Sequence, residues 1–264
     1  MEADTTSKHG RISKSHTSRG ITCKQIVFFA AVLTASFVGV QNSNGQQNGI
    51  LGIRAGANFT KISGDLNFYG DIDDLDMSLS LKFKPGFQIG LVLNFPMNND
   101  KLMFQTGIIY AQQGAKWEDS ASDTDQGVSI KYEMFVEMTL NYLQVPANFL
   151  YRHYLNSGNI LLLQAGPYLG YGLGGNLKIG TTVSAMGFSE SESFEETIKF
   201  GSDKEKHFLK TLDLGLGFGI GMLFNEKFQV GVGYNFGLTD IGHRVEMKNN
   251  GIALTLAYMF GSNN

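Results

Sequence analysis

The segment from Leu212 to Phe224 alternates between bulky and small residues, and this alternation constrains the fold more than any other feature of the chain. Its even positions are all large and apolar, and most of its odd positions are glycine. Successive side chains of a β-strand point to opposite faces, so this spacing gives one bulky apolar face and one face of small side chains. The same phase returns between Phe228 and Thr239. Strands of this kind are typical of small barrels in lipid.

Eight segments of the chain carry this period of two. They lie at about 49–60, 84–95, 101–115, 138–153, 159–177, 208–224, 227–240 and 250–261. Short connections rich in turn-forming residues follow the second, fourth and sixth segments, at 96–100, 155–158 and 225–226. Longer connections follow the first, third, fifth and seventh, at 61–83, 116–137, 178–207 and 241–249. This sorting predicts an all-β fold, an eight-stranded antiparallel up-and-down transmembrane β-barrel with three short periplasmic turns and four longer extracellular loops.

The direction of the apolar faces separates a membrane barrel from a soluble, lipocalin-like barrel. The interior of eight strands is only just wide enough for side chains or for one small ligand. About six large residues from each strand would overfill it, whereas glycines and small residues fit. The apolar faces also carry no charge through the strand centres, and an Arg or Lys at the bilayer midplane costs about 2–4 kcal/mol. We therefore expect the bulky residues to face lipid.

Polar residues occupy the faces opposite to the apolar ones and are expected to fill the lumen. The polar belt at similar heights comprises Arg54, Gln88, Gln105 and Gln164. Arg152 is expected near the periplasmic end of the lumen and Asp213 near its external end, too far apart for a direct ion pair. A buried polar group without a partner costs about 1–3 kcal/mol, so these groups should be cross-linked by hydrogen bonds. The narrow interior predicts a plugged lumen.

The N-terminal segment differs from the rest of the chain. Basic residues up to Lys24 precede an uncharged run at 26–40, which is shorter than the roughly 20 residues of a spanning helix. We expect a signal peptide and leader at 1–47 and a barrel domain at 48–264. The single cysteine, Cys23, excludes an internal disulfide framework, and it precedes the apolar run, unlike the lipid-carrying cysteine of a lipoprotein.

Several short motifs carry a resemblance to a known family. They are GIRAGANF at 52–59, YLQVP at 142–146, AGPYLG at 165–170, YNFGLTDI at 234–241 and AYMF at 257–260. In this order the motifs resemble the PorT-like outer-membrane β-barrel proteins, over about 49–261. The resemblance implies a Gram-negative cell outer membrane as the location and insertion by the barrel-assembly machinery. The family's namesake is associated with protein secretion and gliding machinery, but the resemblance implies no particular biochemical activity.

Motifs for catalysis, cofactors and metals were weighed against simpler interpretations. The glycines from Gly215 to Gly221 keep strand spacing, whereas a nucleotide-binding loop needs a glycine turn that opens a helix. The acidic run at 71–76 lacks the glycine and terminal glutamate of an EF-hand loop, so a solvated loop face is favoured over a calcium site. No Gly-x-Ser-x-Gly, His-Glu-x-x-His or paired-cysteine pattern occurs. We therefore expect no catalytic residue, no cofactor and no bound metal.

These observations favour a non-enzymatic envelope protein that acts through its extracellular loops or its envelope partners. A narrow barrel supplies a rigid anchor, and the variable material lies at one end. The alternatives are a small-solute porin or a transport or secretion accessory, and, ranked lower, an enzyme that modifies outer-membrane lipid. The expected partners are outer-membrane lipid and lipopolysaccharide, the barrel-assembly machinery, and other envelope or secretion components. A net charge of -3 argues against nucleic acid.

Overall fold

The computed structural model describes residues 49–64, 80–97, 101–125, 128–203, 205 and 207–261. Met1–Gln46 and Gln47–Asn264 form separate units, and the described residues all belong to the second. The expected signal peptide and leader at 1–47 lie outside the described residues.

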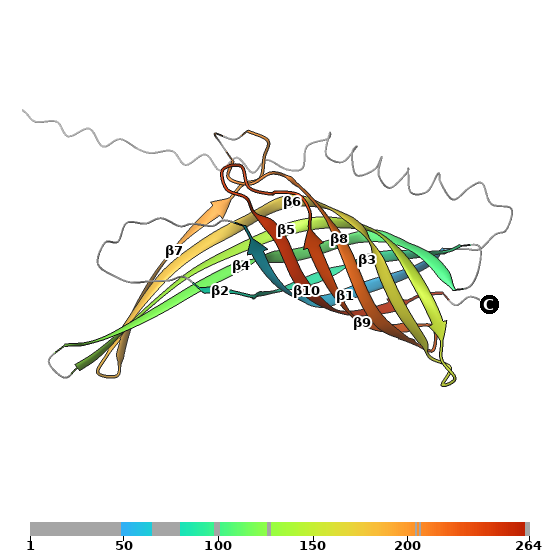
Figure 1. Ribbon diagram of the computed structural model, residues 1–264, viewed down its shortest axis with the longest axis horizontal. Coiled ribbons are helices and arrows are strands. Elements are labelled where there is room, and N and C mark those ends of the chain that lie inside the picture. Colours follow the sequence, from blue (N-terminus) through green and yellow to red (C-terminus); the bar gives the residue numbers. More distant parts are fainter. Residues whose placement is uncertain are drawn as a thin grey trace, which may run out of the picture. The chain divides into compact units, whose positions relative to one another are not determined.

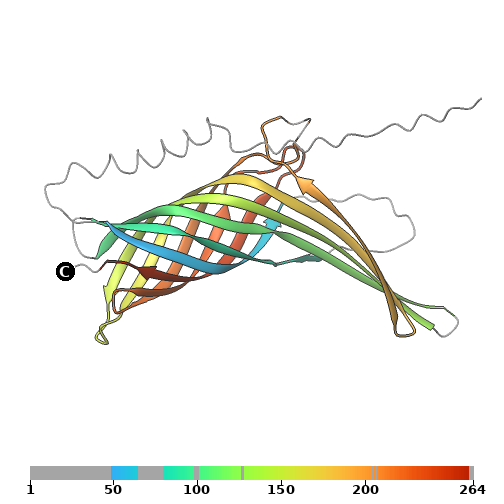
Figure 2. The ribbon, with the colours of Figure 1, turned by 180° about the vertical axis from the view of Figure 1, so that it is seen from behind.

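The described residues form ten strands. They are β1 (Ile50–Ser63), β2 (Ser80–Lys82), β3 (Lys84–Pro96), β4 (Leu102–Asp125), β5 (Val128–Tyr154), β6 (Ile160–Ala185), β7 (Phe188–Ile198), β8 (Leu212–Phe224), β9 (Phe228–Gly237) and β10 (Lys248–Met259). Hydrogen-bonded pairing follows the order β4-β3-β1-β10-β9-β8-β6-β5, and β5 also pairs with β4. Each of these eight strands therefore has two antiparallel neighbours, and their sheet curves round into a barrel (Figures 1 and 2). The short β2 adds to β4, and β7 adds to β6.

Tight turns join β5 to β6 and β8 to β9, where the sequence predicted them. Asn225 and Glu226 both have positive φ, as a two-residue hairpin turn of type I′ requires. In the other turn, the backbone N–H of Leu155 donates to the carbonyl of Asn159 at 2.9 Å. Much of the connection between β3 and β4 lies outside the described residues.

Two of the expected long loops are instead mostly β-structure. The sequence predicted strand ends at 115, 138 and 177, but β4 continues to Asp125, β5 begins at Val128 and β6 continues to Ala185. β7 occupies a further part of the expected loop at 178–207. These segments extend beyond the barrel as one curved sheet, which we call the projecting sheet: 116–125 of β4, 128–137 of β5, 176–185 of β6, and β7 (Figure 1). The prediction was wrong because a strand outside lipid can carry charges on its outward face, so charged residues do not mark the end of such a strand.

The faces of the strands exchange polarity where the projecting sheet begins. On β4, the outward face is apolar at Ile108 but charged at Lys116, while the inward face changes from Gln105 to Trp117. Irregular backbone marks the boundary. Gly114 has φ of 141°, and the pairing of β5 with β6 shifts register between Asn141 and Tyr142. A bulge of this kind bends and twists a sheet, so it can direct the strands away from the barrel wall.

The outward face of the barrel is apolar and exposed, as predicted. Ile220 of β8 lies opposite Leu163 of β6 and Val232 of β9, and all three side chains are exposed. At the turn end, the rings of Phe228 and Tyr258 are 5.1 Å apart in an edge-on contact. Aromatic residues at strand ends are typical of the interfacial girdles of membrane barrels.

Candidate functional site

Polar side chains on the inner face of the neighbouring strands β1, β3 and β4 form hydrogen-bonded chains. Arg54 Nη2 donates to Gln105 Oε1 at 2.6 Å, and Gln105 Nε2 donates to Asn94 Oδ1 at 2.7 Å. Separately, Gln88 Nε2 donates to Asn58 Oδ1 at 2.9 Å. The structure thus joins Arg54 to Gln105 within the predicted belt, and gives Gln88 a partner outside it.

A cavity of about 60 Å³ lies in the same part of the interior. Arg54, Gln88 and Gln164 line it, together with Gln144 and further amide side chains. Gln105 is not part of its lining. Glycines of β8 and β9 form another part of the wall, and because they have no side chains they leave this space open. Apolar residues such as Ile109 and Leu162 complete the lining, and Arg54 is the one charged residue in it.

The two predicted end residues of the lumen are buried and lie apart. The guanidinium of Arg152, at the turn end, lies 5.2 Å from the ring centre of Tyr154. Asp213, at the loop end, accepts a hydrogen bond from Asn249 Nδ2 at 3.0 Å. The same amide group lies 3.2 Å from the Tyr142 hydroxyl. Among the described residues, Arg152 and Asp213 form no ion pair with each other.

Two apolar layers, which sequence analysis missed, also occupy the interior. The turn-side layer comprises Val92, Ile109, Ile160, Leu162, Leu223, Ala257 and Met259. The loop-side layer comprises Ile62, Ala115, Trp117, Val136, Met138, Leu140, Tyr142, Ile198, Leu209, Ile241 and Met247. Trp117, interpreted from the sequence as a rim or loop anchor, is buried in the second layer. A signal was present, because Val92, Ile109 and Leu162 have the strand phase of the lumen residues.

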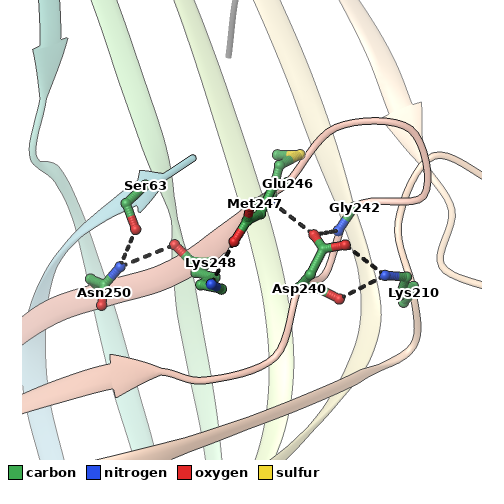
Figure 3. Close-up of polar contacts among 8 residues, drawn as sticks. All are labelled: Ser63, Lys210, Asp240, Gly242, Glu246, Met247, Lys248 and Asn250. Carbon is green, nitrogen blue, oxygen red and sulfur yellow. Dashed lines mark hydrogen bonds and ion pairs between the residues drawn. The ribbon is translucent and has the colours of Figure 1, made fainter. Parts of the chain in front are cut away.

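A network centred on Asp240 holds the chain between β9 and β10 at the loop end (Figure 3). The Asp240 carboxylate accepts hydrogen bonds from Lys210 Nζ at 2.7 Å and from the backbone N–H groups of Gly242 and Met247. Burial pushes the pKa of Asp240 upward, but these hydrogen bonds outweigh it and hold this pKa below the usual range of an aspartate. The network fixes the segment that carries Ile241 and Met247 into the loop-side layer.

The projecting sheet has one largely polar and one largely apolar face. On the apolar face, Tyr132 lies opposite Val183, and Ile179 lies opposite Phe194. Directly opposed residues of an antiparallel pair have their side chains on the same face. Phe194 is 63% exposed and Phe188, at the end of β7, is 82% exposed. The face therefore presents large apolar side chains beyond the part that covers the loop-side layer.

The outermost strand of this sheet, β7, is acidic. It carries Glu190, Glu192, Glu195 and Glu196 and no basic residue. It pairs with β6, and no other described strand pairs with its outer edge. On the polar face, hydroxyl groups link the two strands, with Thr182 Oγ1 3.0 Å from Ser191 Oγ. Glu190, Glu192 and Glu196 lie on the same face as Phe194, so the apolar face ends in an acidic edge.

The family profile of the outer membrane protein beta-barrel domain matches residues 41–242. The chain belongs to this family. The protein is therefore located in the cell outer membrane and has an all-β, antiparallel fold. Specific membership of the PorT-like group remains a prediction.

Solved structures of other outer-membrane proteins resemble this chain at low sequence identity. The attachment invasion locus protein Ail of Yersinia pestis is 17% identical, over 81% of this chain and 100% of that chain, with a TM-score of 0.30. Neisserial surface protein A is 12% identical, over 81% and 100%, with a TM-score of 0.33. OprG of Pseudomonas aeruginosa is 15% identical, over 83% and 99%, with a TM-score of 0.26. No curated protein matches the chain.

The described part of the chain contains no helix with the length and hydropathy to cross a membrane. It also holds no group of three or more His, Cys, Asp or Glu side chains placed to hold a metal ion. The acidic run at 71–76, weighed above as a calcium site, lies outside the described residues.

Proposed function

We propose that this protein is a non-enzymatic envelope protein, a closed eight-stranded transmembrane barrel with a plugged lumen that serves as an anchor. The short connections between β3 and β4, β5 and β6, and β8 and β9 lie in the periplasm, and the loops and the projecting sheet lie outside the cell. The projecting sheet is the binding surface. Membership of the outer-membrane barrel family and the exchange of strand polarity at Gly114 support this arrangement, because a sheet with charged and polar residues on one face suits water and not lipid.

The filling of the lumen supports an anchor over a pore. Two apolar layers lie at different depths, and hydrogen-bonded amide side chains lie in the interior with them. An eight-stranded barrel has little room left once its interior is filled by side chains. A continuous water path would have to pass both apolar layers. The small-solute porin remains the second candidate, because the interior does contain a polar cavity.

Planar-bilayer recording separates these two functions. We expect the purified protein to insert without steady single-channel openings. The matched control replaces Trp117 and Leu140 of the loop-side layer with alanine, which should increase any leak through the barrel. Steady openings from the unaltered protein would contradict the plugged lumen and favour the porin.

The apolar face of the projecting sheet and the acidic β7 together define the partner's chemistry. Exposed apolar patches on a folded protein commonly mark interaction sites. Four glutamates on one strand favour a basic partner by electrostatic complementarity. We therefore expect a protein segment that presents apolar and basic side chains to the face around Phe194.

Photo-crosslinking in intact cells tests this surface. A photoreactive phenylalanine analogue at position 194 should give a discrete adduct with one protein. The same analogue at position 193, where Ser193 is exposed on the opposite face of β7, should give little or none. The adduct should weaken when Glu190 and Glu192 are changed to glutamine. Equal labelling from both positions, or from neither, would contradict a binding role for this face.

A further inference from the structure

The barrel interior contains a buried positive charge that the protein does not neutralise locally. Arg54 lies in β1 and is 5% exposed. Its Nη2 donates to the uncharged amide oxygen of Gln105, and its Nε has no hydrogen-bond partner. No aspartate or glutamate lines the cavity beside it. Arginine keeps its proton in proteins, so the charge cannot be removed by deprotonation.

A charge in this position needs a counter-charge. The desolvation penalty of a buried ion is several kcal/mol unless an opposite charge and hydrogen bonds compensate it. The buried carboxylate of Asp213 is hydrogen-bonded to Asn249 and does not line this cavity. The other buried arginine, Arg152, adds positive charge to the lumen. The interior of the barrel is therefore short of negative charge around Arg54.

The cavity supplies donors and space for an anion. Gln144 is 6% exposed and lines the same cavity, and its Nε2 also has no partner. Two side chains with an unused N–H donor, Arg54 of β1 and Gln144 of β5, thus line one space, and the guanidinium of Arg54 is charged. The cavity of about 60 Å³ is several times the roughly 10–15 Å³ that one water needs on the same measure. Water could accept these hydrogen bonds, but it would leave the charge of Arg54 uncompensated.

We propose that the cavity binds one small inorganic monovalent anion of the halide class, held by the side chains of Arg54 and Gln144. Water fills the remaining space. The turn-side layer, whose Ile109 and Leu162 also line the cavity, keeps the ion from exchanging freely, so it enters as the barrel folds and is retained. The bound anion is then a structural component of the lumen. This site does not depend on the binding role of the projecting sheet.

Bromide provides a direct test, because it can be located by anomalous diffraction. The protein is refolded into detergent with sodium bromide as the only halide salt and then crystallised. We expect an anomalous peak inside the cavity, within hydrogen-bonding distance of Arg54 and Gln144. The peak should be lost in Arg54→Met and retained in Arg152→Met, which removes a buried arginine outside the cavity lining. A wild-type cavity without anomalous density would overturn the proposal.

A stability measurement in solution covers the case in which Arg54→Met does not fold. Wild-type protein refolded in chloride should have a higher Tm than protein refolded in gluconate at equal ionic strength, because gluconate is too large for the cavity. Gln144→Leu keeps the charge but removes one donor, and it should reduce this difference in Tm. Arg152→Met should leave the difference unchanged. Equal Tm values for the wild type in the two salts would contradict a bound halide.

Discussion

Arginine in place of Ile220 is expected to prevent most of the protein from inserting into the outer membrane. Ile220 is near the middle of β8, is 48% exposed, and lies between Leu163 and Val232 on the outward face. An arginine at the bilayer midplane of a barrel costs about 2–4 kcal/mol. Phe218 and Met222, which lie two residues before and two residues after Ile220 on β8, are also apolar. The new charge therefore has no polar neighbour on its own strand face.

The effect of Ile220→Arg is measured as the fraction of protein that folds into lipid vesicles, from the shift in its electrophoretic mobility on heating, and as its free energy of unfolding in urea. A matched control places the same charge outside the membrane. Ser122→Arg on the exposed polar face of the projecting sheet should insert as well as wild type. Ile220→Leu controls for the change in packing. If Ile220→Arg and Ser122→Arg insert equally well, the outward face of β8 does not contact lipid.

The period of two was sufficient to predict most of the barrel. Lipid imposes an uncharged outward face on every strand, so the rule applies along the whole of 212–224 and can be followed through the other strands. The same rule places Arg54, Gln105 and Asp213 in the barrel interior, although it does not identify their hydrogen-bond partners. The partners themselves were not predictable. The contact of Arg54 with Gln105 joins β1 to β4 across β3, and it depends on the stagger of the strands, which alternation does not encode.

The projecting sheet and the apolar layers escaped prediction for a common reason. Both depend on inward-facing apolar residues, whereas the requirement for an uncharged face in lipid applies only to the outward face. Val136 and Met138 pack under Leu209 and Met247, which come from segments far away in the chain. Where the outward face becomes charged, the strand signal used for lipid-facing segments ends, although the pairing of β4 with β5 continues. The alternation of apolar residues on the inward face of β5 and β6 remained as a signal there.

Alanine in place of Gly114 is expected to destabilise the protein at the junction between the barrel and the projecting sheet. Gly114 has φ of 141°, which L-residues rarely adopt, and such strain costs on the order of 1–3 kcal/mol. A Cβ at this position would also overlap the carbonyl oxygen of Met138 on the paired strand. Backbone must move to relieve this overlap, so the total cost should exceed the cost of the strain alone.

A movement of the backbone at Gly114 should disturb both the barrel and the projecting sheet. The Gly114 carbonyl accepts a hydrogen bond from Thr60 Oγ1 at 2.9 Å, which ties β4 to β1 across β3. The added Cβ would also lie close to Lys84, whose ammonium group is 3.3 Å from Glu137. Displacing Gly114 therefore weakens the tie to β1 and the pairing that leads into the projecting sheet. Hydrogen exchange should rise in 116–137, and the Tm should fall.

Gly187 offers a matched control for the strain. It has φ of 83° in the turn between β6 and β7, and a Cβ there would meet nothing within 4 Å. Gly187→Ala should therefore lower stability by the strain alone, with changes in hydrogen exchange confined to the end of the β6–β7 hairpin. Gly114→Ala should have the larger effect and should also alter the barrel side of β4. The two substitutions could instead lower the Tm equally and leave hydrogen exchange in 116–137 unchanged. In that case the close approach of Met138 to Gly114 does not fix the junction. The bulge between Asn141 and Tyr142 would then determine where the strands leave the barrel wall.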